Sequence, residues 1–145
     1  MSIVEDFLTA SEEQEIIDAI IVAEKNTSGE IRVHIENHTE KKPLERAQEV
    51  FFLLKMQNTT KRNGVLFYVG VQDHTFAIIG DQGINEIVED KFWDKTRDLV
   101  ISHFKKQNFK QGLVEGILKT GDKLKTFFPI LDEDRNELSN EISKS

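Results

Sequence analysis

Three short segments of the chain combine glycine with oxygen-bearing side chains. They are Ser28-Gly29-Glu30, Asn63-Gly64 and Gly80-Asp81-Gln82-Gly83. Hard cations prefer carboxylate, carbonyl and water oxygens, and Ca²⁺ takes about six to eight of them. Asp90 follows the third segment closely enough to reach it. These residue types predict a divalent-cation site for Ca²⁺, with Mg²⁺ as the alternative, whose ligands are Glu30, Asp81 and Asp90.

The backbone of the same segments is expected to contribute to this site. Glycine and asparagine favour tight turns, which leave carbonyl oxygens accessible. We expect this supporting role for Gly29, Asn63, Gly64, Gly80 and Gly83. The alternative is a purely structural role, in which the glycines only make turns and the acidic side chains face water.

A phosphatase is the second chemistry that these residues allow. Hydrolysis of a phosphate ester needs charge neutralisation and a positioned nucleophile. Asp81 is the candidate catalytic carboxylate, and Arg62 is the candidate residue facing the phosphate. Because the chain carries a formal net charge of −7, binding an anionic substrate would require a metal ion.

Apolar periodicity predicts the strands that position these segments. Residues 30–36 alternate between apolar and polar side chains, which indicates a strand with one wetter face. Residues 65–71 are almost continuously apolar and indicate a central strand, and residues 75–79 form a short β-rich run. The first two strands enclose a helical segment and should be parallel, whereas the last two should form a hairpin. This topology brings all three segments to one edge of the sheet.

Helical periodicity occupies much of the remaining chain. It begins after a capping signal at Thr9 or Ser11, returns after Pro43, and continues in two stretches up to about residue 128. The predicted fold class is α/β: a three-layer, Rossmann-like α/β/α sandwich with a small mixed sheet, made of a parallel pair and an antiparallel hairpin. Residues 1–128 are expected to form a single domain, and residues 129–145 an acidic, flexible tail.

Composition argues against several classes of function. The negative charge and a sequence pI of about 5.1 disfavour binding to nucleic acid, which needs a basic face. The chain has no cysteine, so disulfides, thiolate metal sites and cysteine nucleophiles are excluded. No apolar stretch approaches the roughly 20 residues of a membrane span, and the N-terminus lacks a signal-peptide pattern. We therefore expect no membrane insertion and a cytoplasmic location.

Four motifs, in order along the chain, resemble the TPM domain family. Residues 28–33 resemble the family's opening strand, and residues 62–69 resemble its Asn-Gly-Val-Leu strand. Residues 76–90, with Gly80, Gly83, Ile84 and Asp90, are similar to its hairpin return and following loop. Residues 109–117 are similar to a helix that carries two glycines. The resemblance covers roughly residues 8–128.

The resemblance implies an α/β/α sandwich, and binding of calcium or other divalent metals is associated with that fold. Plant members are thylakoid-lumen proteins linked to photosystem II repair, with acid phosphatase activity in that branch. Another member is an accessory protein of acetylcholine receptors. Bacterial members often have glutamate two residues after the second loop glycine, where this chain has Asn85. This departure weakens the case for phosphatase chemistry.

Three functions are therefore open. The first is a divalent-metal-binding, TPM-like domain with a role in protein maintenance or assembly. The second is a non-catalytic module that binds a protein partner. The third is a metal-dependent acid phosphatase that hydrolyses phosphate monoesters. The first two can coexist in one molecule.

Overall fold

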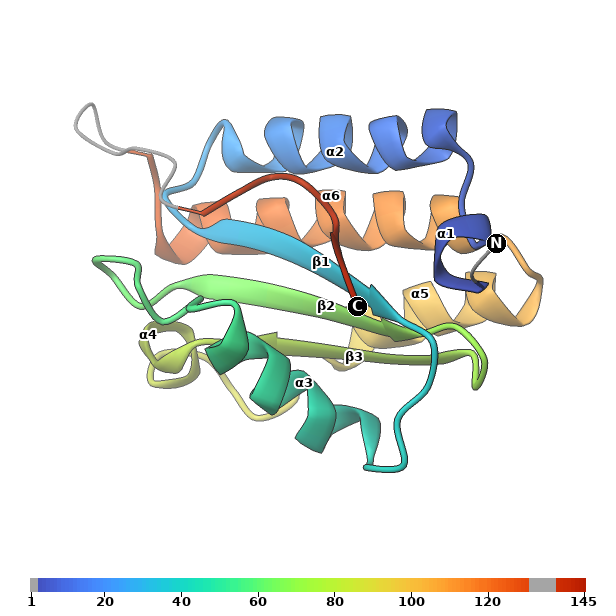
Figure 1. Cartoon of the computed structure of the whole chain (residues 1–145). Coiled ribbons are helices and arrows are strands. Elements are labelled where there is room, and N and C mark those ends of the chain that lie inside the picture. Colours follow the sequence, from blue (N-terminus) through green and yellow to red (C-terminus); the bar gives the residue numbers. More distant parts are fainter. Residues whose placement is uncertain (1–2, 131–137) are drawn as a thin grey trace.

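The structure is a computed structural model that describes residues 3–130 and 138–145. Within these residues lies a four-stranded mixed sheet with the strand order β3-β2-β1-β4 (Figure 1). The strands are β1 (Glu30–Glu36), β2 (Gly64–Gly70), β3 (Thr75–Gly80) and β4 (Ser143–Lys144). β1 runs parallel to β2 and to β4, and β2 and β3 form an antiparallel hairpin. The predicted parallel pair and hairpin are confirmed.

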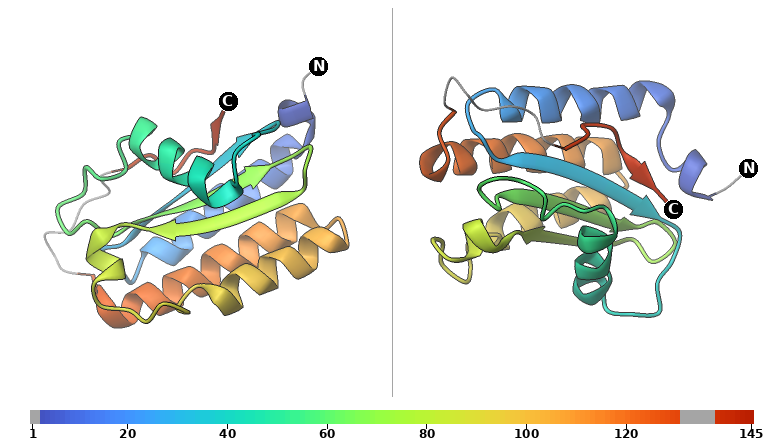
Figure 2. Two further views of the ribbon diagram at one scale, coloured as in Figure 1. Left: turned by 90° about the horizontal axis from the view of Figure 1, so that it is seen from below. Right: turned by 60° about the vertical axis from the view of Figure 1, so that its left-hand side comes forward.

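Helices cover both faces of the sheet. α2, α5 and α6 lie on one face and α3 lies on the other (Figure 2). The helices are α1 (Ile3–Asp6), α2 (Ala10–Glu24), α3 (Pro43–Leu53), α4 (Gln82–Asn85), α5 (Asp94–Lys105) and α6 (Phe109–Phe127). These layers confirm the predicted α/β/α sandwich. In the described part of the chain, no helix has the length and apolar character needed to cross a membrane.

Each face of the sheet has its own apolar core, because alternate residues of a strand point to opposite faces. Ile31 and Val33 of β1 and Phe67 of β2 are buried on the side of α2, α5 and α6. Leu66 and Tyr68 of β2 are buried on the side of α3. β2 is therefore buried along its whole length, as its continuous apolar run predicts.

The first long helix begins at one of the two predicted capping positions. The Thr9 hydroxyl accepts a hydrogen bond from the Glu12 amide, and the Glu12 carboxylate accepts one from the Thr9 amide, each over 3.0 Å. This reciprocal capping box satisfies two amides that the helix itself leaves unpaired. The structure thereby selects Thr9 over Ser11 as the residue that caps α2.

The C-terminal residues contribute a strand, β4, that the sequence pattern does not predict. Residues 131–137 of the predicted tail lie outside the described residues. Ser143 and Lys144 pair in parallel with His34 and Ile35, so the last residues of the chain lie along β1 (Figure 1). Two residues of polar type carry no strand periodicity, which is why the sequence pattern does not reveal β4.

Candidate functional site

The three glycine-containing segments meet at one edge of the sheet, as their topology predicts. Glu30 and Gly64, the first residues of β1 and β2, are paired in the parallel ladder. The Glu30 amide donates to the Asn63 carbonyl over 3.4 Å, and the Asp81 amide donates to the Gly64 carbonyl over 2.9 Å. Backbone hydrogen bonds therefore link each of the three segments to its neighbour.

The segment that leads into β2 crosses the segment that follows β3. At this crossing, the Gly83 amide donates to the Arg62 carbonyl over 2.8 Å. A Cβ atom at Gly83 would lie 2.1 Å from the Lys61 carbonyl oxygen and 2.6 Å from that of Arg62, so only glycine fits. Arg62 has a φ of 50°, a left-handed conformation that costs a residue with a side chain roughly 1–2 kcal/mol. The crossing thus gathers carbonyl oxygens beside a strained residue.

Asp81 joins this crossing to the helix that follows it. Its two carboxylate oxygens accept hydrogen bonds from the Arg62 guanidinium, over 2.8 and 2.9 Å. One of them also accepts a hydrogen bond from the Gln82 amide over 2.7 Å, which makes Asp81 the N-cap of α4. The glycine-containing segment 80–83 indicates a loop, but its last two residues, Gln82 and Gly83, already belong to α4. The hydrogen bond with Asp81 raises the pKa of Arg62, and Asp81 itself is only 5% exposed.

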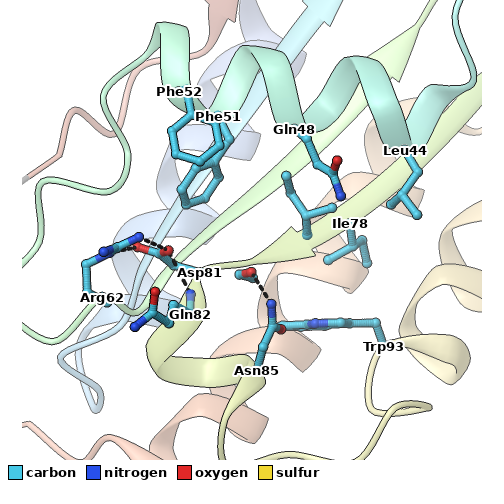
Figure 3. A pocket seen from close by; sticks show the side chains of 12 residues that line it. Leu44, Gln48, Phe51, Phe52, Arg62, Ile78, Asp81, Gln82, Asn85 and Trp93 are labelled. Carbon is cyan, nitrogen blue, oxygen red and sulfur yellow. Dashed lines mark hydrogen bonds and ion pairs between the residues drawn. The ribbon is translucent and has the colours of Figure 1, made fainter.

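A groove opens between α3 and the junction of β3 with α4, and the Arg62–Asp81 pair lies at one end of it (Figure 3). Its volume is about 420 Å³. Leu44 and Phe52 of α3 line one side and Trp93 lines the opposite side. Leu44 and Phe52 are 52% and 59% exposed. The site therefore combines a charged end with largely apolar walls.

The predicted cation ligands lie in three different surroundings. Asp81 is bound by Arg62, whereas Glu30 accepts a hydrogen bond from the Leu138 amide over 2.6 Å. Asp90 is exposed in the connection between α4 and α5. Across residues 3–130 and 138–145, no group of three or more aspartate, glutamate or histidine side chains could hold a metal ion. A cation at this edge would therefore need carbonyl and water oxygens as well.

The glycines at this edge allow neighbouring groups to approach their backbone closely, and they do not adopt an unusual backbone geometry. No glycine in the described residues has a positive φ. A Cβ atom at Gly29 would lie 2.8 Å from the Leu124 side chain, and one at Gly64 would lie 3.3 Å from the Met56 carbonyl oxygen. The absence of a side chain, more than freedom in φ, therefore explains these glycines.

Two features of the site were not predicted from the sequence: the partly buried Glu24 and the exposed Phe52. Glu24 accepts a hydrogen bond from the Ile31 amide over 2.9 Å. Burial raises the pKa of Glu24 to about 7, although the hydrogen bond from Ile31 lowers it. The negative charge of the nearby Glu30 carboxylate adds to the rise. The second feature is the exposed Phe52, which the sequence could have revealed. Phe51 and Phe52 are adjacent in a helix and cannot both face the core, so one of them must be exposed.

Comparisons with known proteins agree with the observed fold. The sequence profile of the TPM domain matches residues 3–123. The NMR structure of BA42 protein from the psychrophilic bacterium Bizionia argentinensis is similar, with a TM-score of 0.92 and 56% sequence identity over 100% of both chains. Among curated proteins, the comparison finds no match.

Two more distant structures share the fold alone. The N-terminal domain of a P. gingivalis protein has a TM-score of 0.69 and 16% identity, over 91% of this chain and 83% of that one. The N-terminal domain of cg2496 protein from Corynebacterium glutamicum has a TM-score of 0.64 and 13% identity, over 81% of this chain and 74% of that one. The profile match spans most of the sequence and agrees with the observed sandwich, and the chain therefore belongs to the TPM domain family.

Proposed function

We propose that this TPM domain binds a divalent cation, Ca²⁺ or Mg²⁺, where the segment before β2 crosses the start of α4. The observation that carries the proposal is the concentration of oxygen atoms there. The carbonyl oxygens of Lys61 and Arg62 approach Gly83, and the Asp81 carboxylate lies two residues before it. Hard cations bind carboxylate, carbonyl and water oxygens in one shell. The bound cation would hold the segment before β2 against the start of α4. It would thereby stabilise the charged end of the groove.

Arg62 supports the proposal because it already places a positive charge on Asp81. The Arg62 side chain is 40% exposed, whereas that of Asp81 is 4% exposed. Because the Arg62 guanidinium borders solvent, it can turn outward and leave the buried Asp81 carboxylate to another cation. A divalent cation can therefore take its place at the carboxylate. In the cell, such a domain would serve protein maintenance or assembly in a manner that depends on the cation.

The test is a titration of the full chain with Ca²⁺ and with Mg²⁺, followed by amide NMR after treatment with EDTA. We expect saturable shifts confined to residues 59–64 and 80–85. Asp81→Asn should abolish them, because it removes the charged ligand. Arg62→Gln should tighten binding by roughly fivefold, the equivalent of about 1 kcal/mol, because it removes the competing cation.

Asp98→Asn is the matched control, since it removes one exposed carboxylate from α5. Its titration should match that of the wild type. Weak shifts spread over the acidic surface in all four proteins would instead indicate ordinary counterion binding and would overturn the proposal. A weaker affinity in Arg62→Gln would show that Arg62 does not compete with the cation.

Protein interaction through the groove is the second candidate function. It is favoured by the exposure of Leu44 and Phe52 beside a concave apolar surface, since contiguous exposed apolar patches often mark interaction sites. Phe52→Glu should abolish capture of a stoichiometric partner in EDTA, whereas Leu118→Glu, on the surface of α6, should not. Equal capture by the two variants would exclude the groove as the interface.

Phosphatase activity has less support from this geometry. A carboxylate nucleophile needs an oxygen directed at the substrate, but both oxygens of Asp81 accept hydrogen bonds from Arg62. Arg62 is likewise turned towards Asp81 instead of an open phosphate site. Phosphatase activity can be tested with a small phosphate monoester in the presence of Mg²⁺. Turnover by the wild type that disappears in Asp81→Ala would support phosphatase activity after all.

A further inference from the structure

One face of β1 carries a row of polar side chains. Glu30, Arg32, His34 and Glu36 alternate with apolar residues and therefore project to the side of the sheet on which α3 lies. α3 itself packs against β2 and β3. Of the polar row of β1, Glu36 accepts hydrogen bonds from Arg46 of α3. The row is also contacted by the chain's own residues 138–145, which run beside β1 (Figure 2).

The first half of this segment matches the first half of the row. The Leu138 amide donates to the Glu30 carboxylate over 2.6 Å. Burial lowers the pKa of Arg32, and the negative charge of Glu141 opposes that effect. This order, Leu138 beside Glu30 and Glu141 nearer to Arg32, agrees with the parallel direction in which β4 runs beside β1.

The second half of the segment continues the same order. The Ser143 hydroxyl lies 3.1 Å from His34 Nδ1, and the Ser145 hydroxyl lies 2.9 Å from His34 Nε2. The Ser145 hydroxyl also donates to the Glu36 carboxylate over 3.0 Å. Glu30, His34 and Glu36 are thus each hydrogen-bonded by the segment, and the segment carries a carboxylate followed by two hydroxyls at alternate positions.

Side chains hold this segment more than the backbone ladder does. β4 contains only Ser143 and Lys144, and one further backbone hydrogen bond runs from the Ser145 amide to the Ile35 carbonyl over 3.1 Å. Leu138 and Ile142 are partly buried against the two cores. A short strand with little buried apolar area opens at a lower free-energy cost than the strands of the core.

We propose that the polar face of β1 is a peptide-docking surface, filled by residues 138–145 of its own chain and able to accept the same segment from a second copy. The occupant is an extended segment with a carboxylate and two hydroxyls at alternate positions, as in Glu141-Ile142-Ser143-Lys144-Ser145. Exchange between copies links two molecules without new contacts, because the same residues pair in the same register. This inference is independent of the cation site.

The test must weaken the attached segment, because a tethered segment has a local concentration of about millimolar or higher. The full-length Ser143→Ala/Ser145→Ala variant, isotope-labelled, keeps the chain intact and removes the hydroxyl contacts. An unlabelled peptide with residues 138–145 is then titrated into it. We expect saturable amide shifts at Arg32, His34 and Glu36, and a shift of the variant's own last residues towards random-coil values.

The control peptide carries alanine in place of both serines. It should bind at least tenfold more weakly than the native peptide. Equal binding of the two peptides, or no shift with millimolar native peptide, would overturn the proposal. If the variant does not fold, hydrogen exchange of the wild type supplies the second measurement. The Ser145 amide should exchange by local opening at a rate far above that of the Phe67 amide in β2, and equal rates at both amides would equally overturn it.

Discussion

Glu36 is the centre of a buried polar network on the α3 side of β1. Arg46 of α3 donates to its two carboxylate oxygens over 2.9 and 3.0 Å, and the Tyr68 hydroxyl donates to one of them. Burial alone would raise the pKa of Glu36. Hydrogen bonds from Arg46, Tyr68 and Ser145 outweigh that effect and lower the pKa to about 2. The folded state therefore stabilises the ionised carboxylate.

Glu36→Gln should lower the free energy of unfolding by about 2 kcal/mol at neutral pH, the usual cost of losing hydrogen bonds to a charged group. The folded pKa of Glu36 lies below its unfolded value of about 4.3. The contribution of the carboxylate is thus complete above about pH 5 and is lost as the pH falls towards 2. Urea unfolding at about pH 7, 4 and 3 should show that the difference in free energy of unfolding between the wild type and Glu36→Gln becomes smaller as the pH falls.

Tyr68→Phe is the comparison for this prediction, because it removes one of the hydrogen bonds and keeps the carboxylate. It should cost less than Glu36→Gln at neutral pH. A gap between wild type and Glu36→Gln that does not change with pH would show that the stability of the network does not depend on ionisation of Glu36.

Glu24 should have the opposite effect on stability. Its folded pKa of about 7 lies above the unfolded value of about 4.3, so the folded state binds more protons between these limits. Stability linked to Glu24 is therefore lost as the pH rises from about 4 to 7. Glu24→Gln cannot ionise, and its free energy of unfolding should fall less than that of the wild type between about pH 5 and 8. The exposed Glu45→Gln should follow the wild type, and identical pH profiles for all three proteins would contradict the prediction.

At the scale of elements, the sequence predicts most where apolar pattern and burial coincide. β2 is apolar throughout and buried on both faces, and the order of strands and helices then places the loops at one edge of the sheet. α4 and β4 are different, because they depend on side-chain contacts. α4 is capped by Asp81, and β4 lies beside His34, whose partner Ser143 is 109 positions away in the chain. No local pattern contains such a distant contact.

The candidate site shows the same division. Topology places Asp81 and Arg62 together, and the structure confirms that they are neighbours. Their ion pair could not be predicted, because several charged groups compete for each partner at one sheet edge. The close approach of residues 61–62 to Gly83 could not be predicted either, because it depends on how two loops run relative to each other in space. Sequence alone therefore predicted that these segments meet at one sheet edge, but it did not establish their contacts.

The contact between α2 and α6 depends on a glycine. A Cβ atom at Gly121 would lie 2.7 Å from the Cβ atom of Ala23 and 2.8 Å from its carbonyl oxygen. Replacing glycine by alanine within a helix normally stabilises it by up to about 1 kcal/mol. Here the clash with a neighbouring backbone should reverse the sign, and Gly121→Ala should destabilise the protein by about 1–3 kcal/mol in urea unfolding.

Gly116→Ala is the matched variant on the same helix. A Cβ atom there would meet the side chains of Val100 and Phe67, at 2.5 and 3.1 Å. Side chains adjust more readily than a backbone, so Gly116→Ala should cost less than Gly121→Ala. An equal or larger cost at Gly116 would show that α2 moves away from α6 without loss of packing.

At the scale of the whole molecule, the net charge of −7 affects every experiment with cations. An acidic surface attracts counterions without any specific site, and salt screens the repulsion among its carboxylates. A specific site behaves differently, because it stabilises the folded state in proportion to the logarithm of the cation concentration once the site is saturated. The two effects can therefore be separated by comparing cations at equal ionic strength.

Ca²⁺ should raise the melting temperature of the wild type more than NaCl at the same ionic strength. At a concentration of about one hundred times Kd, the excess should correspond to about 2.7 kcal/mol. Asp81→Asn should remove the excess and keep the part shared with NaCl, because its net charge changes by only one unit. Asp98→Asn makes the same change of charge on an exposed part of α5 and should keep the excess. Equal responses of the three proteins would assign the whole effect to the overall charge, since a charge effect cannot distinguish one lost carboxylate from another.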